Sequence, residues 1–282
     1  MAVATAAKLS EHRRAVLESA VVRFAGESGD GMQLTGGQFT ETTAIAGNDL
    51  ATFPDFPAEI RAPAGTTYGV SAFQINFGSR AIKTAGDELD VLVAMNPAAL
   101  KVNINDLRSG GIVIADTGAF SDKNLRKAGY EKNPLEDGSL AKYRILRIDM
   151  SRLTLEAVKP HGLSQKDGLR TKNMWSLGLV YWMYDRDRQA TVDWLTGKFR
   201  RRPEIAKANI AALNAGHAFG ETAEMADGLP AYRVPPAELE AGLYRNVTGT
   251  EALAWGLMVG AELAGLRLTF CSYPITPASA LL

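Results

Sequence analysis

The chain has 282 residues, enough for one large or two medium domains, and 46% of them are hydrophobic. Lys and Arg total 31, as do Asp and Glu, so the net charge gives no reason to expect nucleic acid or an anionic membrane as a partner. A single cysteine, Cys271, excludes an internal disulfide and cannot alone hold a four-cysteine iron–sulfur cluster. These totals favour a role in binding a small molecule or another protein.

The first twenty residues mix alanine with charged side chains such as Lys8, Glu11 and Arg13, and they lack the apolar core of a secretory signal. We interpret residues 1–19 as an N-terminal extension, either a helix or a mobile lead-in. No window approaches the roughly 18 consecutive apolar residues that a membrane-spanning helix needs. We therefore expect a cytoplasmic protein without a membrane partner.

A strand, a glycine turn and a helix are predicted first along the chain. Val21–Ala25 is short, apolar and β-branched, and the sequence Gly-Glu-Ser-Gly-Asp-Gly follows at 26–31, before a helix-compatible run over 33–46. Glycines let a backbone approach a phosphate, whose charge the positive end of the helix stabilises. The spacing differs by one position from the dinucleotide fingerprint. An anion site and a purely structural turn are equal alternatives on this motif alone.

Three further strands are predicted over 70–77, 91–94 and 112–115. The last two are continuous apolar runs, which are typical of strands covered on both faces. Between them, the run from Pro97 to Arg108 predicts a short helix that ends at the pair Gly110-Gly111. This alternation predicts an α/β domain with a mostly parallel sheet.

The second half of the chain continues the pattern with a strand over 143–148 and helices over 149–158, 174–184, 191–198 and 203–221. The run 174–184 is apolar nearly all round, so we expect its aromatic residues in a core rather than in a ligand site. Glycines and prolines interrupt residues 225–244, which predicts a linker. A helix over 247–268 with a capped start at Thr248 and a strand over 268–270 follow.

Two polar loops have side chains suited to chemistry. Arg61 lies among prolines and near Glu59, so it could bind a phosphate or carboxylate, although a surface Arg–Glu pair is the favoured interpretation. Near the C-terminus, Pro274 and Pro277 bracket Thr276, which indicates either a hydroxyl held in a fixed orientation or a rigid turn. We expect Cys271 to be buried and inert. The three histidines have no metal-ligand spacing.

Taken together, these motifs resemble one family. The run 24–31 with Gly36-Gly37, and the run 59–69, are similar to the gamma domain of 2-oxoacid:acceptor oxidoreductases. The runs 248–252 and 272–279 resemble the start of their alpha domain, which binds the pyrimidine end of thiamine diphosphate. The resemblance implies four segments: an extension (1–19), an α/β gamma-type domain with a mostly parallel sheet (20–224), a linker (225–244), and the start of a thiamine-diphosphate pyrimidine-binding α/β domain (245–282), incomplete because the sequence stops early in it.

The resemblance implies oxidative decarboxylation of a 2-oxoacid to its acyl-CoA and carbon dioxide, with electrons passed to ferredoxin. We expect 2-oxoglutarate as the substrate, with pyruvate, a branched-chain 2-oxoacid or indolepyruvate as alternatives; a non-catalytic nucleotide-binding module is the alternative of another class. The expected partners are ferredoxin and a beta subunit that carries Mg²⁺ and a 4Fe-4S cluster, in a dimer of alpha-beta heterodimers. No nucleic-acid partner is expected.

By the same resemblance, Thr276 is the expected catalytic residue, lying against the 2-oxoacid and the thiamine ring, where its hydroxyl would stabilise developing negative charge. The substrate loop around it comprises Tyr273, Pro274, Ile275, Thr276 and Pro277. Coenzyme A is assigned to Gly26, Ser28, Gly29, Gly31 and Arg61, and no metal ligand is expected on this chain. One departure affects Arg61, because the family often has a Gly-Gly pair directly after this arginine and here residues 62–64 intervene before Gly65. The thiamine-binding glutamate is expected beyond Leu282.

Overall fold

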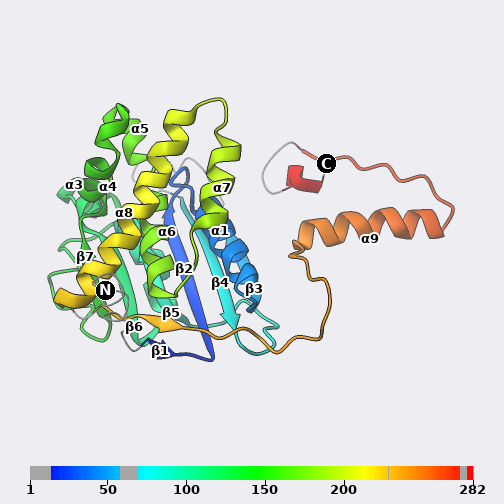
Figure 1. Cartoon of the computed structure of the whole chain (residues 1–282), viewed down its shortest axis with the longest axis horizontal. Helices are drawn as coiled ribbons and strands as arrows, with labels where there is room; N and C mark the ends of the chain where they lie inside the picture. Colours follow the sequence, from blue (N-terminus) through cyan, green and yellow to red (C-terminus); the bar gives the residue numbers. More distant parts are fainter. Residues whose placement is uncertain (1–13, 58–68, 228, 274–277, 282) are drawn as a thin grey trace, which may run out of the picture. The chain divides into compact units, whose positions relative to one another are not determined.

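The computed structural model describes residues 14–57, 69–227, 229–273 and 278–281 (Figure 1). It divides into two compact units, residues 1–238 and residues 239–282. Among the described residues, no helix has the length and apolar character needed to cross a membrane.

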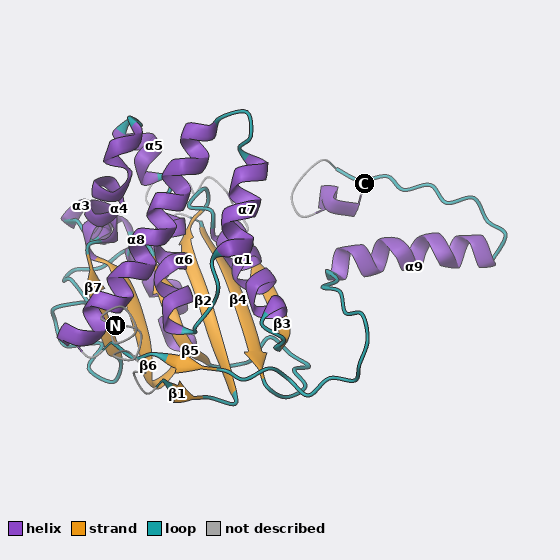
Figure 2. Cartoon of the chain, in the orientation of Figure 1, coloured by secondary structure: helices purple, strands orange, loops and turns teal. Residues whose placement is uncertain are grey.

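A six-stranded sheet forms the centre of the first unit, in the order β3-β4-β2-β5-β6-β7 (Figure 2). The strands are β2 (Ser19–Glu27), β3 (Asp49–Asp55), β4 (Val70–Gly78), β5 (Leu89–Ala94), β6 (Leu107–Asp116) and β7 (Arg144–Ile148). Strands β2, β5, β6 and β7 are parallel neighbours, whereas β4 pairs antiparallel with both β2 and β3. The predicted mostly parallel sheet is confirmed. The edge strand β3 was not predicted.

Helices cover both faces of this sheet, and α1, α6 and α8 lie together on one of them (Figure 1). The helices are α1 (Met32–Ile45), α2 (Pro97–Asn103), α3 (Asp122–Lys127), α4 (Met150–Val158), α5 (Gln165–Leu169), α6 (Lys172–Met183), α7 (Gln189–Lys198) and α8 (Pro203–Asp227). Side chains of β5 alternate between two cores: Val91 and Val93 pack with α1, α6 and α8, and Leu92 and Ala94 pack with α2 and α3. The prediction of strands covered on both faces is therefore confirmed.

Helix α6 is buried from Asn173 to its last residue, Met183, as its composition predicted. Its side chains Trp175 and Tyr181 are among the largest that are fully buried, and both belong to the main core. The helix can approach α8 closely because it carries Gly178: a Cβ there would lie 1.9 Å from the carbonyl oxygen of Leu213. The aromatic residues of this run therefore pack in the core rather than lining a ligand site.

The glycine pair after α2 does not end a helix, so that prediction was wrong. Helix α2 stops at Asn103, a 3₁₀ turn covers Ile104–Asp106, and β6 already begins at Leu107. Within β6, Gly110 has a φ of 75° at a place where the pairing with β5 is irregular. A left-handed glycine serves a β-bulge as well as it serves a helix end. The pairing of β6 with β5 decides that Gly110 lies in a bulge of a strand and not at a helix end.

Parts of the predicted extension and linker belong to the first unit. Strands β1 (Ala15–Val16) and β8 (Tyr232–Arg233) form a two-stranded parallel sheet, and β2 starts inside the predicted extension. Val234 is buried against the main core, and the backbone N–H of Ala237 donates to the carbonyl of Gly47 at 2.8 Å. The described end of the extension is therefore extended chain rather than helix, and only the part of 225–244 after Glu238 lies outside this unit.

The second unit contains the helix α9 (Gly249–Leu263). Thr248 caps it as predicted: the N–H of Glu251 donates to Thr248 Oγ1 at 3.2 Å, and the N–H of Thr248 donates to Glu251 Oε2 at 2.9 Å. No strand forms over 268–270, because this stretch has no pairing partner among the described residues. Cys271, expected to be buried, is exposed in this structure.

Candidate functional site

The strands β2, β5, β6 and β7 all end at one edge of the sheet, and the chain leaves β2 and β5 in opposite directions there. Helix α1 follows β2 and packs its Phe39 into the main core, whereas α2 follows β5 and packs its Ala99 into the core on the other face. In open α/β sheets, ligands bind beyond the carboxyl ends of strands at such a switch point. The predicted glycine turn lies at this place.

The turn between β2 and α1 needs its glycines for local reasons. Gly29 and Gly31 have φ values of 106° and 78°, which other residues adopt only with strain. The N–H of Asp30 donates to the Glu27 carbonyl at 2.9 Å, and the N–H of Glu27 donates to Asp30 Oδ2 at 2.7 Å. A Cβ at Gly26 would lie 2.8 Å from that carboxylate oxygen. These contacts give the turn a defined shape without any ligand.

The turn presents an uncapped helix end. Gly31 is the N-cap of α1 and provides no side-chain hydrogen bond, and the first turn of the helix carries no acidic residue. Four backbone N–H groups at a helix start have no partner within the helix, and the helix dipole favours negative charge there. This end of α1 therefore has the properties of an anion site.

The carboxylates of Glu27 and Asp30 lie in the same turn, and their negative charge opposes the binding of an anion at the start of α1. Glu27 ends β2, and burial raises the pKa of its carboxyl above the usual value. The charge of Asp30 raises this pKa further, and Lys127 opposes both effects. An anion at this turn would therefore need hydrogen-bond donors in addition to the helix end.

The start of α6 closes one side of the site. Asp116 ends β6 and accepts hydrogen bonds from Lys172 Nζ at 2.7 Å, from Ser151 Oγ at 2.7 Å and from the N–H of Ser151 at 3.1 Å. Next to Lys172, the carboxamide of Asn173 lies against the turn: its Nδ2 is 2.5 Å from the place that a Cβ of Gly31 would occupy. No motif in the sequence indicated Asn173, because only the folded chain brings it to the turn.

The structure describes the positions of only some of the predicted site residues. Gly26, Ser28, Gly29 and Gly31 come together in the turn, where the N–H of Ser28 donates to the carbonyl of Gly69 at 3.4 Å. Arg61 lies outside the described residues. On either side of its segment, Asp55 and Ala72 offer their carbonyls to Gln33 Nε2 at 3.1 and 2.9 Å, so β3 ends and β4 begins beside α1.

Most of the predicted substrate loop, Pro274, Ile275, Thr276 and Pro277, also lies outside the described residues. Tyr273 precedes it in the second unit and is 76% exposed. The roles assigned to these residues therefore stay predictions.

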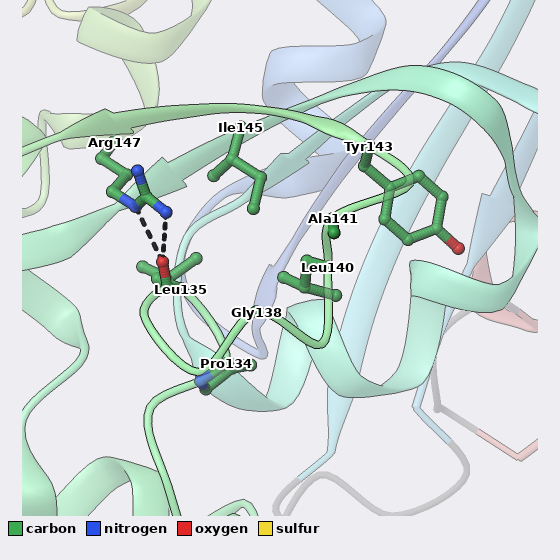
Figure 3. A pocket seen from close by; sticks show the side chains of 8 residues that line it. All are labelled: Pro134, Leu135, Gly138, Leu140, Ala141, Tyr143, Ile145 and Arg147. Atoms are coloured by element: carbon green, nitrogen blue, oxygen red, sulfur yellow. Dashed lines mark hydrogen bonds between the residues drawn. The ribbon is translucent and has the colours of Figure 1, made fainter.

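A separate hollow of about 250 Å³ lies beside β7, lined by eight residues between Pro134 and Arg147 (Figure 3). Its charged group, Arg147, already donates from Nε to the carbonyl of Leu135 at 2.8 Å. Its hydroxyl, on Tyr143, donates to the carbonyl of Ile104 at 2.9 Å. With both polar groups engaged, the hollow offers little to recognise a ligand.

The fold is an α/β domain whose helix α1 begins, without a side-chain cap, at the switch point of the sheet. Comparison with known proteins identifies the family. A model of the pyruvate ferredoxin/flavodoxin oxidoreductase family matches residues 21–219. The chain belongs to this family. It is 56% identical over 266 residues, 94% of its length, to the 2-oxoglutarate oxidoreductase subunit KorA of Mycobacterium tuberculosis.

Two solved structures are also similar. The 2-oxoglutarate:ferredoxin oxidoreductase from Magnetococcus marinus, solved with 2-oxoglutarate, coenzyme A and succinyl-CoA bound, matches 94% of this chain with a TM-score of 0.67 and 27% identity. The gamma subunit of a keto/oxoacid ferredoxin oxidoreductase from Geobacter sulfurreducens matches 73% of this chain and 99% of its own, with a TM-score of 0.50 and 18% identity, which shows the fold alone. The chain spans 40% of the KorA protein and 40% of the Magnetococcus chain.

Proposed function

We propose that this chain is part of a subunit of a 2-oxoglutarate:ferredoxin oxidoreductase. The reaction converts 2-oxoglutarate, coenzyme A and oxidised ferredoxin into succinyl-CoA, carbon dioxide and reduced ferredoxin, and it is reversible. The observation that carries the proposal is the 56% identity to KorA over 94% of the chain. The ligands bound in the similar Magnetococcus structure support the same substrate and product.

The glycine turn is the proposed site of coenzyme A on this chain. Gly26, Ser28, Gly29 and Gly31 form a turn in which backbone can approach a phosphate, at the uncapped end of α1. Arg61 is proposed as a further contact, because its planar fork suits a phosphate. Of the proposed cofactors and co-substrates, coenzyme A is the one whose phosphates fit this turn and the uncapped start of α1.

The other cofactors are assigned by resemblance to the family. Thiamine diphosphate supplies the carbanion chemistry of decarboxylation. The loop Tyr273–Pro277 would lie against the pyrimidine side of thiamine and the 2-oxoacid, and the Thr276 hydroxyl would donate to the substrate oxygen that gains negative charge.

The chain has one cysteine, and no three His, Cys, Asp or Glu side chains cluster among the described residues. By resemblance to the family, we place Mg²⁺ and the 4Fe-4S cluster on a partner beta subunit.

The proposed partners are this beta subunit and ferredoxin, with two alpha-beta heterodimers forming the enzyme in the cytoplasm. Pyruvate, a branched-chain 2-oxoacid or indolepyruvate are the alternative substrates; a 28% identity to the ketoisovalerate oxidoreductase subunit VorA of Methanothermobacter marburgensis makes the branched-chain class the first of these to test. Family membership leaves the non-catalytic nucleotide-binding alternative without specific support.

The proposal is tested by anaerobic reduction of a viologen dye with the full-length subunit bound to its beta subunit. We expect the fastest reduction with 2-oxoglutarate among the four 2-oxoacids, and no sustained reduction without coenzyme A. Thr276→Val should lower kcat about 100-fold, because it removes a donor to developing charge. Thr269→Val, in the same unit, is the control and should keep full activity. Faster reduction with another 2-oxoacid would contradict the assigned substrate.

A further inference from the structure

Asn173, in the first turn of α6, has a buried carboxamide that the fold does not use. The residue is 7% exposed, and its Oδ1 is sealed from solvent without a hydrogen-bond partner. Nδ2 forms no hydrogen bond with the described residues either. More than about nine in ten buried polar groups in native proteins are paired, so an unpaired carboxamide calls for a specific reason. Packing alone would be served better by leucine, which has no polar group to desolvate.

The carboxamide is aimed at the glycine turn. Nδ2 lies 2.5 Å, and Cγ 3.3 Å, from the place that a Cβ of Gly31 would occupy, so the side chain fills the space that the glycine leaves. Gly31 is the N-cap of α1, a helix of 14 residues whose amino end has no side-chain cap. An N–H donor and a positive helix end therefore lie side by side.

The neighbours of Asn173 hold it in place. Lys172 is bound to Asp116, and the N–H of Met174 donates to the carbonyl of Thr171 at 2.9 Å. The charge of Lys172 is used in that ion pair and is not free to meet a ligand. Asn173 is therefore a buried side chain of this turn of α6 that lies against the glycine turn with an amide donor to offer.

We infer that Asn173 binds the diphosphate of coenzyme A, with Nδ2 donating to a phosphate oxygen at the amino end of α1. The inference rests on the proposed function, which places coenzyme A at this turn. It also accounts for the carboxylates of Glu27 and Asp30, since a donor from α6 helps to offset their repulsion of an anion.

The test measures dissociation constants by calorimetry with the full-length subunit in complex with its beta subunit. The ligands are coenzyme A, 3′-dephospho-coenzyme A, which keeps the diphosphate, and pantetheine, which lacks it. We expect Asn173→Ala to raise the dissociation constants of the first two about tenfold or more and to leave that of pantetheine unchanged. Asn173→Asp, which keeps the shape and adds a negative charge, should weaken the first two further. Asn209→Ala is the control, because Asn209 is equally buried but donates within its own helix to Ile205.

The outcomes separate the two proposals. If Asn173→Ala weakens pantetheine as much as coenzyme A, its role is structural and the inference is overturned. If Gly31→Ala weakens coenzyme A and both Asn173 variants bind it normally, the turn is the site and the inference alone fails. Failure of the unmodified complex to bind coenzyme A at all would instead refute the proposed function.

Discussion

Lys172 and Asp116 form a largely buried ion pair at the carboxyl edge of the sheet. The Nζ of Lys172 lies 2.7 Å from Asp116 Oδ2, and the two side chains are 13% and 0% exposed. The pair joins the end of β6 to the start of α6, and Ser151 adds the start of α4. It therefore fixes the elements that surround the glycine turn.

Replacing Lys172 by methionine should lower the free energy of unfolding by about 3 kcal/mol, because it leaves the Asp116 carboxylate buried without its cation. Urea denaturation, followed by tryptophan fluorescence, measures this loss, since Trp175 and Trp182 are buried in the folded chain. Arg170→Met is the matched control: Arg170 pairs with Asp167 at 2.9 Å, but both side chains are largely exposed. We expect little change for the control. Equal effects of the two substitutions would show that the buried pair contributes no more than a surface pair.

The adjacent glycines of α1 should respond in opposite directions to alanine. A Cβ at Gly36 would lie 2.1 Å from the ring of Phe73, whereas a Cβ at Gly37 would meet nothing within 4 Å. Gly36→Ala should therefore destabilise the protein by about 1–3 kcal/mol through overpacking. Gly37→Ala should stabilise it by about 0.5–1 kcal/mol, since alanine has the higher helix propensity. Thermal melting of the two variants would contradict this account if both shifted the same way.

A second pair of glycines tests the contact between α6 and α8. A Cβ at Gly178 would lie 1.9 Å from the backbone carbonyl oxygen of Leu213. Because a backbone atom cannot move aside as a flexible side chain can, Gly178→Ala forces the two helices apart. We expect a loss of about 3 kcal/mol or failure to fold. Gly197→Ala, in α7 with open space around it, is the control and should raise the melting temperature slightly. A stable, fully folded Gly178→Ala variant would refute the close contact.

His217 should make stability depend on pH. Burial lowers the pKa of its imidazole below the ordinary 6.5, and the charges of Arg188 and Arg14 lower it further, whereas Glu221 and Asp185 raise it. The unfolded chain therefore takes up a proton more readily than the folded chain below about pH 6.5, and the free energy of unfolding falls as the pH drops through that range. His217→Gln should reduce this dependence, measured as melting temperature between about pH 7.5 and 5. An unchanged slope would show that other groups cause it.

Local patterns predicted the elements that their own side chains define. The apolar runs of β5 and β6, the buried helix α6 and the capped start of α9 at Thr248 all lie where the sequence indicated. Strand β3 was missed because it is a half-exposed edge strand, contains Pro54 and shows no alternation of apolar residues. Its pairing with β4 is what makes it a strand.

The glycine turn was predictable for the same local reason, since strand, turn and helix are consecutive. Asn173 was not, because it follows a long stretch of other elements and reaches Gly31 only through the packing of α6. The ion pair of Asp116 and Lys172 likewise joins distant parts of the sequence. Arg61 and Thr276 stay predictions, since both lie outside the described residues.

The most direct test of the central claim is the product balance of the complex formed by the full-length subunit and its beta subunit. Under anaerobic conditions, with 2-oxoglutarate, coenzyme A and a one-electron viologen, we expect one succinyl-CoA and two reduced viologens for each carbon dioxide released. Release of carbon dioxide with succinic semialdehyde as the product, and with coenzyme A unconsumed, would contradict the central claim.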